Sequence, residues 1–390
     1  YFYRLISRAQ RVSIFYDSRN GPTYTSEMSR YITQLLYLHP ECKITHTLGS
    51  YEVSPASHTE IIIPRTPEIK EQLRSFCTPG GRKLSASSIN MYINCSLQFY
   101  LSRICGLNTD EEAKDYMDSA TYGTILHAVA QRAYLEWRGD NQSVKVTAEM
   151  LDDLIHSRSR LDRMITETVN EIFNKRPAGD TTPLVGEARV MGNLIRYFLT
   201  RMFELEKTIA PFDFIDAEHV IDGTMRLADD LSINFTQSLD RVDRVFPEGH
   251  YGNPAMGTVR IIDYKTGTDD TDFTSVEDLF ETPSSGSRRK AILQLMFYSR
   301  AYAEKFRYEG PIQPMIYQMR TIYTKGLEPL KSGSGRNKAP FTDYHELIDE
   351  FMPRFEAVIR EMLLSDKPFT QTEKEDNCKF CLFKPLCRRQ

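Results

Sequence analysis

Two segments of the sequence carry side chains whose types and spacing could bind a metal ion. Asp263 and Lys265 stand two residues apart in the strand-like run 258–265, and Asp240 belongs to an earlier strand-like segment. Because side chains alternate along a β-strand, Asp263 and Lys265 share one face. If the two segments pair as a hairpin, Asp240 approaches Asp263, and two neighbouring carboxylates repel each other unless a cation lies between them. Oxygen ligands of this kind suit Mg²⁺ or Mn²⁺.

These groups match the needs of phosphodiester hydrolysis. A metal ion there neutralises charge on the phosphate and supplies a deprotonated water, and a lysine can orient that water. Asp240 and Asp263 would be metal ligands, Lys265 would be the cation, and His127 is a candidate third ligand. Taken alone, Asp263 and Lys265 also describe a simple surface ion pair. A lone histidine beside an apolar helix face is more often a core residue than a ligand.

Cysteine usage indicates a second site. The chain has seven cysteines, an odd number, and nothing marks an oxidising compartment, so a disulfide framework is a poor interpretation. Cys378, Cys381 and Cys387 crowd into the C-terminal tail, and Cys95 would supply a fourth thiolate. Four thiolates can hold Zn²⁺ or an iron–sulfur cluster, and the spacing alone leaves both open. The other three are expected to be buried as apolar residues: Cys42, Cys77 and Cys105.

Hydrophobic periodicity predicts the elements that must position these groups. Alternating apolar residues indicate strands, and apolar residues three and four apart indicate helices. The expected strands are residues 220–227, 231–246, 258–265 and 315–323. The expected helices are residues 85–99, 123–137, 288–306 and 343–364, with a mostly helical insertion over 140–210. Strands and helices mixed in this order predict an α/β fold around one sheet.

The acidic motifs resemble those of a known family. Asp240, then Asp263-Tyr264-Lys265, then the helical segment 294–298 is similar to the PD-(D/E)XK nuclease superfamily in its RecB-like branch. In that branch a Gly-x-x-x-His helix precedes the acidic motifs, as Gly123 to His127 does here. The resemblance implies a restriction-endonuclease-like core, in which helices flank a central mixed sheet. The helical insertion and the C-terminal cysteine cluster would be additions to that core.

The resemblance also implies roles for individual residues. Lys265 would serve the attacking water, while Gln294 and Tyr298, one helical turn apart, would support the site or contact DNA. The implied metal ligands are His127, Asp240, Asp263 and the carbonyl of Tyr264.

The cysteine pattern resembles the iron–sulfur members of the same superfamily. These include AddB-type helicase–nuclease subunits and a group of CRISPR-associated exonucleases. The resemblance implies a [4Fe–4S] cluster in preference to Zn²⁺, on the four thiolates of Cys95, Cys378, Cys381 and Cys387. Such a cluster would pin the C-terminal tail to the helix that opens the nuclease domain, closing a long loop.

The N-terminal segment carries a second resemblance. Residues 3–12 are similar to the last helix and strand of a superfamily 1 helicase motor domain. The periodicity of the N-terminal segment predicts a helix over 3–10, a strand over 11–17 and a helix over 26–38. Residues 1–81 are therefore expected to be a remnant of a helicase-like α/β domain plus a linker, and residues 82–390 the nuclease domain. No phosphate-binding loop occurs, so this polypeptide is not expected to be an ATPase by itself. Because the chain begins with Tyr1 and not Met, we expect the C-terminal part of an AddB-type protein.

These observations predict a Mg²⁺-dependent deoxyribonuclease that acts as an exonuclease on single strands or unwound duplex ends. A partner helicase subunit would feed the strand to it during double-strand-break repair by recombination. The alternatives are a stand-alone exonuclease of the CRISPR-adaptation type and a catalytically idle DNA-binding scaffold. The formal charge of −4 argues against a basic coat on nucleic acid, and no apolar run is long enough for a membrane span. We expect a cytoplasmic protein.

Overall fold

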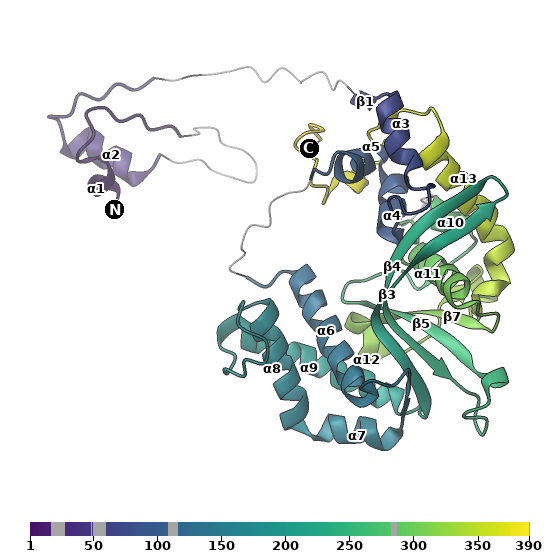
Figure 1. The fold of residues 1–390 in the computed structure, drawn as a ribbon. Helices are drawn as coiled ribbons and strands as arrows, with labels where there is room; N and C mark the ends of the chain where they lie inside the picture. The colour runs from purple at the N-terminus through teal and green to yellow at the C-terminus, as the bar shows by residue number, and fades with distance from the viewer. Residues whose placement is uncertain (17–27, 48, 50–59, 108–115, 282–286, 390) are drawn as a thin grey trace. The chain divides into compact units, whose positions relative to one another are not determined.

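The computed structural model describes residues 1–16, 28–47, 49, 60–107, 116–281 and 287–389 (Figure 1). The chain forms two compact units, Tyr1–His58 and Thr59–Gln390. Among its described residues, the first unit contains two helices, α1 (Phe2–Ile6) and α2 (Arg30–Leu38).

The first unit differs from the predicted elements in two places. Helix α1 ends at Ile6 and does not continue to residue 10. Residues 11–16, predicted to be a strand, have no regular structure, and the last predicted position, Asp17, lies outside the described residues. All six of these residues are exposed. A strand needs a partner for its backbone hydrogen bonds and a face to bury, and this segment has neither among the described residues.

The second unit is built around a mixed sheet of five strands. The strand order is β2-β3-β4-β5-β7, with β5 and β7 parallel and the other neighbours antiparallel. The strands are β2 (Val144–Val146), β3 (Phe212–Ala228), β4 (Leu231–Val245), β5 (Thr258–Lys265) and β7 (Ile312–Gln318). A mixed sheet with helices on both faces confirms the predicted α/β fold.

Strand β3 is more than twice as long as the segment predicted for it. The prediction covered residues 220–227, whereas the 17-residue strand begins at Phe212. Phe212 and Phe214 alternate inward, but a bulge between Phe214 and Asp216 shifts the register of the strand. The bulge interrupts the period-two pattern on which the prediction depended. The extra length of β3 matters because it carries a group of the candidate site.

Each face of the sheet is covered by its own set of helices (Figure 1). One hydrophobic core lies between the sheet and α4 (Ala86–Asn94), α10 (Glu277–Phe280), α11 (Lys290–Phe306) and α13 (Ile348–Leu364). The other lies between the sheet and α6 (Ser119–Arg138), α7 (Ala148–His156), α8 (Arg158–Ile172) and α9 (Gly186–Glu206). The predicted helical insertion is thus three helices that, with α6, cover one face. The break between α8 and α9 contains the two prolines, Pro177 and Pro183.

One predicted strand ends early. Strand β7 stops at Gln318, and the rest of the segment predicted as strand to residue 323 forms a 3-10 turn, Met319–Thr321, and the start of α12 (Ile322–Lys325). Met319 and Ile322 are buried in the core beneath α9, and their three-residue spacing suits a helical turn. Tertiary packing therefore decided the conformation of this apolar run.

A two-stranded sheet joins the start of the second unit to its end. Strand β1 (Ile62–Ile63) pairs antiparallel with β10 (Phe369–Thr370). Nearby, the buried Arg65 donates hydrogen bonds to the carbonyl oxygens of Met362 at 2.9 Å and Glu361 at 3.0 Å. Helix α3 (Pro67–Arg74) also packs against α13. Residues 60–81 are therefore structurally continuous with the unit that holds the sheet.

Three cysteines do not have the predicted burial. Cys42 and Cys105 are exposed and Cys77 is half-buried, so the expectation that all three are core residues is wrong. Each lies in a turn or at the end of a helix, where the backbone stays near the surface.

Candidate active site

The pairing of β4 with β5 brings the two motif carboxylates together. Arg241 pairs with Ile262 at the end of the ladder, which places Asp240 next to Asp263 on the face covered by α11. The backbone N–H of Tyr264 donates a hydrogen bond of 2.9 Å to Oδ2 of Asp240. Asp263 is 1% exposed. Two carboxylates thus lie close together with little contact with water.

A histidine and a third carboxylate complete the site. The Nδ1 atom of His127, on α6, lies 3.3 Å from Glu218 and 3.5 Å from Asp240. The potential ligand atoms of these three residues all lie within 4.8 Å of one another. Glu218 was not predicted from the sequence, because it lies in the part of β3 that the periodicity missed. Its φ of 49° is rare for a residue other than glycine, and such strain often marks a functional position.

The hydrogen bonds of His127 call for one more proton or a metal ion at the site. Its Nε2 atom lies 3.0 Å from the carbonyl oxygen of Tyr264, which can only accept, so Nε2 carries the proton. In neutral histidine, Nδ1 would then be an acceptor facing the carboxylates of Glu218 and Asp240. A second proton on His127, a proton on Asp240 or a metal ion resolves this conflict. The donor set of one imidazole and several carboxylates suits a hard divalent cation.

The pKa values indicate the same shortage of positive charge. Burial and the charge of Asp263 raise the pKa of Asp240 to about 7, against an ordinary value of 3.8. Burial also raises the pKa of Asp263, although Lys265 opposes the shift. For His127, burial lowers the pKa, but Glu218 and Asp240 outweigh it and the net shift is upward. These shifts reflect burial and a local excess of carboxylates over basic side chains.

Lys265 and Gln294 both contact Asp263. The Nζ atom of Lys265 lies 2.7 Å from Oδ2 of Asp263, which nevertheless accepts no hydrogen bond of good geometry. Burial lowers the pKa of Lys265, but Asp263 raises it further, so the amine stays protonated. Gln294, on α11, donates to Oδ1 of Asp263 at 3.3 Å and to the hydroxyl of Tyr298 at 2.6 Å. The structure therefore gathers all the predicted residues of the acidic site around one point.

The opposite face of the same two strands carries a second set of charges. Arg241 is fully buried and donates to Asp243 at 2.6 Å and to Glu206 at 2.6 Å. Arg260 donates to both oxygens of Asp243 at 2.7 Å. Arg241 also donates to the hydroxyl of Tyr264 at 3.3 Å. This network links β4, β5 and α9 directly behind the carboxylate pair.

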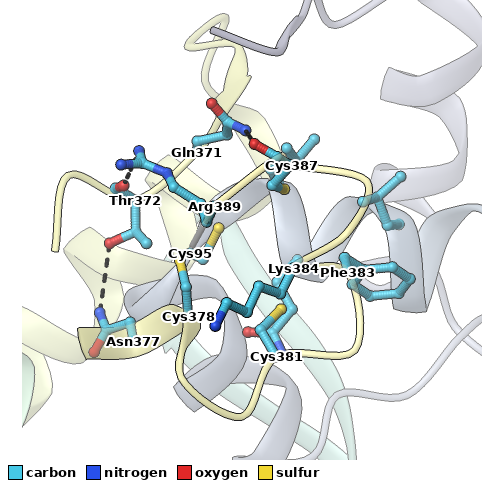
Figure 2. Close-up of a pocket in the computed structure, with 13 residues that line it drawn as sticks. Cys95, Gln371, Thr372, Asn377, Cys378, Cys381, Phe383, Lys384, Cys387 and Arg389 are labelled. Atoms are coloured by element: carbon cyan, nitrogen blue, oxygen red, sulfur yellow. Dashed lines mark hydrogen bonds between the residues drawn. The ribbon is translucent and has the colours of Figure 1, made fainter. Parts of the chain in front are cut away.

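The four predicted cysteines lie around one small cavity (Figure 2). Cys95 stands between α4 and α5 (Ser96–Phe99), and the other three belong to the tail that follows β10. None of them forms a disulfide. Burial raises the pKa of the Cys378 thiol, and the neighbouring Cys95, Cys381 and Cys387 raise it further. Residues almost three hundred positions apart in the chain thus form one thiol-lined site.

The number of these sulfurs bears on what they could hold. A tetrahedral zinc site with Zn–S bonds of about 2.3 Å places its sulfurs ~3.8 Å apart. Four thiols around one small cavity could serve such an ion or an iron–sulfur cluster, and both take four thiolates.

Comparison with known proteins places the chain in a family. Residues 83–388 match the model of the PD-(D/E)XK nuclease superfamily, a span that includes both the acidic site and the four cysteines. The chain belongs to this superfamily. The prediction of a PD-(D/E)XK nuclease is thereby confirmed, and the five-stranded mixed sheet between helices is consistent with a PD-(D/E)XK core.

Individual proteins resemble the chain only weakly. Among solved structures, a "Putative exonuclease" from Eubacterium rectale matches with 11% identity and a TM-score of 0.35, covering 87% of this chain and 93% of that one. No curated protein matches the chain. Within the described residues, no helix of this PD-(D/E)XK protein is long and apolar enough to cross a membrane.

Proposed function

We propose that this chain is a Mg²⁺- or Mn²⁺-dependent deoxyribonuclease that hydrolyses phosphodiester bonds at the Asp240–Asp263 site. The observation that carries the proposal is the buried carboxylate pair, which is short of a cation and lies in a member of a nuclease superfamily. His127, Asp240, Asp263 and the carbonyl of Tyr264 would hold the metal ion, and Glu218 would be a peripheral partner of this set. When bound, the ion supplies a Lewis acid that polarises the phosphate and lowers the pKa of a water molecule.

The chain's own residues would perform the remaining tasks. Lys265, kept protonated by Asp263, donates to the attacking water or to the developing charge on the phosphate. Gln294 holds the Asp263 carboxylate in place, and Tyr298 in turn holds Gln294. Burial, with nearby negative charge, raises the pKa of Tyr298, so its hydroxyl keeps its proton and stays available as a donor.

The biological setting that we propose follows from the resemblances in the sequence. The enzyme would be the C-terminal part of a cytoplasmic AddB-type subunit, with residues 1–81 as a helicase-like remnant plus a linker and residues 82–390 as the nuclease domain. The last part of that linker, residues 60–81, belongs to the same compact unit as the nuclease domain. It would cut single strands exonucleolytically as a helicase partner unwinds duplex ends during recombinational repair. The family match supports the nuclease part of this arrangement.

The four thiolates would hold a [4Fe–4S] cluster and not Zn²⁺. The resemblance of the cysteine pattern to the iron–sulfur members of the superfamily supports the cluster. The test is anaerobic purification followed by measurement of bound iron, sulfide and zinc, with visible absorption spectra. Iron and sulfide in equal amounts, lost in Cys95→Ser, would support the cluster, whereas one zinc per chain would contradict it.

The nuclease proposal is tested with labelled single-stranded and duplex DNA in Mg²⁺, Mn²⁺ or EDTA. The critical variant is Asp263→Asn, and the matched control is Asp229→Asn, whose carboxylate is fully exposed and far from β5 in the register of the sheet. We expect metal-dependent degradation by the wild type and the control, and none by Asp263→Asn. Full activity in Asp263→Asn would rule out this active site. A folded, metal-loaded wild type that cuts neither substrate would favour the DNA-binding scaffold.

A further inference from the structure

A cavity of about 590 Å³ lies beside the candidate active site, on the face of the sheet covered by α11. Its walls come from the end of α6, the segment just before β2, the first half of β3, the last residues of β4 and the end of α11. This volume lies within the range of sites that bind small ligands. None of the residues that line it belongs to the acidic site or to the cysteine site.

Three elements run from the acidic site into this cavity. On β4, Arg244 lies four residues after Asp240 and on the same face, at roughly 13 Å. On β3, His219 directly follows Glu218. On α11, side chains four residues apart follow one side of the helix from the acidic site to the cavity. These side chains are Gln294, Tyr298, Tyr302 and Phe306. A polymer held at the acidic site could therefore reach the cavity within a few monomers.

The cavity offers aromatic faces. Phe306 is 48% exposed although it is a large apolar residue, and its ring lies 4.7 Å from that of the buried Tyr302 and 6.2 Å from that of His219. Tyr302 thus supports Phe306 from behind and leaves one of its sides open. An exposed ring on a packed aromatic base is the arrangement on which unpaired nucleobases stack.

The charges in the cavity leave one cation available. Asp216 forms an ion pair with Arg138 at 2.6 Å and lies 2.7 Å from Nδ1 of His219, and Asp213 accepts a hydrogen bond from Tyr251. Arg244 forms no ion pair with a carboxylate in the described part of the chain, and its Nε atom is buried without a hydrogen bond. Its guanidinium lies 6.0 Å from the centre of the Tyr308 ring, and Asp213 is its neighbour in the pairing of β3 with β4. A guanidinium without an ion-pair partner, close to an exposed aromatic ring, matches a phosphate and its base.

We propose that this cavity binds one nucleotide of single-stranded DNA a short distance along the strand from the cleaved phosphate. The base stacks on Phe306, and a phosphate lies against Arg244. A base paired in a duplex is already stacked on both sides and cannot enter, so the cavity selects single strands. The inference rests on the proposed function, because it takes DNA as the substrate of the acidic site.

The test measures binding of a fluorescein-labelled oligothymidylate in EDTA, where no cutting occurs, beside an abasic probe of the same length. We expect Phe306→Ala to weaken binding of oligothymidylate about 10-fold, the loss expected for one base stack. Phe306→Tyr retains the ring and should bind like the wild type. The abasic probe should bind the wild type and Phe306→Ala equally, because it has no base to stack.

Arg244→Gln should weaken both probes and reduce the dependence of binding on salt by about one phosphate contact. Its matched control is Arg307→Gln, because Arg307 is exposed, follows Phe306 directly and does not line the cavity. Wild-type binding of oligothymidylate by Phe306→Ala, or equal losses with both probes, would overturn the proposal.

Cutting assays in Mg²⁺ separate this inference from the proposed function. If the wild type cuts DNA and Phe306→Ala binds and cuts like it, the cavity proposal fails and the nuclease stands. If the wild type does not cut but the base-dependent loss in Phe306→Ala appears, the cavity proposal stands and the nuclease proposal fails. Thermal unfolding of each variant verifies that it is folded.

Discussion

Strands β4 and β5 carry buried charged side chains on both faces, and the two sets differ in how their charges are balanced. On the α9 face, Arg241 and Arg260 face Asp243 and Glu206, two cations against two carboxylates. On the α11 face, Asp240, Asp263 and Glu218 outnumber Lys265. A protonated His127 would still leave one carboxylate unbalanced, whereas a divalent metal ion together with Lys265 would balance all three.

The pKa values follow this difference. Burial raises the pKa of any carboxyl, but Arg260 and Arg241 hold the pKa of Asp243 below its ordinary value. Asp240, which lies beside Asp263 and has no arginine partner, has a pKa of about 7. A balanced buried network stabilises the fold, whereas an unbalanced one is a binding site whose missing partner is a ligand. The two faces of one hairpin therefore serve structure and chemistry separately.

The largest expected effect is a loss of activity from a substitution on the α11 face. Asp263→Asn should lower the rate of DNA cleavage by about 10³-fold, because it removes a metal ligand and the partner of Lys265. The unfolding free energy should not fall, since the change removes one of two repelling carboxylates. Single-turnover cleavage and urea unfolding measure the two quantities. A variant that loses activity only in proportion to a loss of folded protein would contradict the assignment.

The second prediction is a substitution on the α9 face, where the buried charges are balanced. Arg241→Met should lower the unfolding free energy by about 3–5 kcal/mol, because it leaves Glu206 and Asp243 buried with one cation between them. Denaturant unfolding measures the loss. The matched control is Glu206→Gln with Arg241→Met, which removes one charge of each sign and should recover part of the stability. If the single change costs nothing, the network does not stabilise β4 against α9.

A pH dependence should belong to the unbalanced face alone. Because folded Asp240 keeps its proton to about pH 7 and the unfolded chain releases it near pH 3.8, the metal-free protein should lose stability as the pH rises between these values. Thermal unfolding in EDTA at several pH values measures this slope, and Asp240→Asn should flatten it. Mg²⁺ should restore stability at neutral pH in the wild type and not in Asp240→Asn. An unchanged slope in the variant would assign the effect to other groups.

The smallest expected effect concerns the residue that only the structure identified. Glu218→Gln should weaken metal binding about 10-fold, the size expected for a peripheral partner of a metal site. Mg²⁺ titration of the cleavage rate measures this shift, and the rate at saturating Mg²⁺ should change little. The control is Glu204→Gln, an exposed carboxylate on α9. A loss at saturating metal as large as that of Asp263→Asn would make Glu218 a principal ligand.

Much of the acidic site could be read from local patterns. Strand β5 has the predicted bounds, and the alternation of side chains along β4 and β5 requires Asp240 and Asp263 to meet once the strands pair. These relations depend on residues close together in the sequence, so periodicity carries them. The family resemblance supplied His127, Gln294 and Tyr298, which the structure brings to the same point.

What the sequence by itself determined is therefore the α/β order of the elements, the nuclease motifs and the set of four clustered cysteines. Only the tertiary structure decided the position of Glu218, which depends on a bulge and a positive φ in β3. It also decided that Arg241 is wholly buried, because charged residues are buried only where partners from distant elements meet them. Likewise, the cavity beside α11 is formed by four elements far apart in the chain. Local patterns determine on which face of a helix or strand a side chain lies, but only tertiary packing determines which groups of other elements contact it.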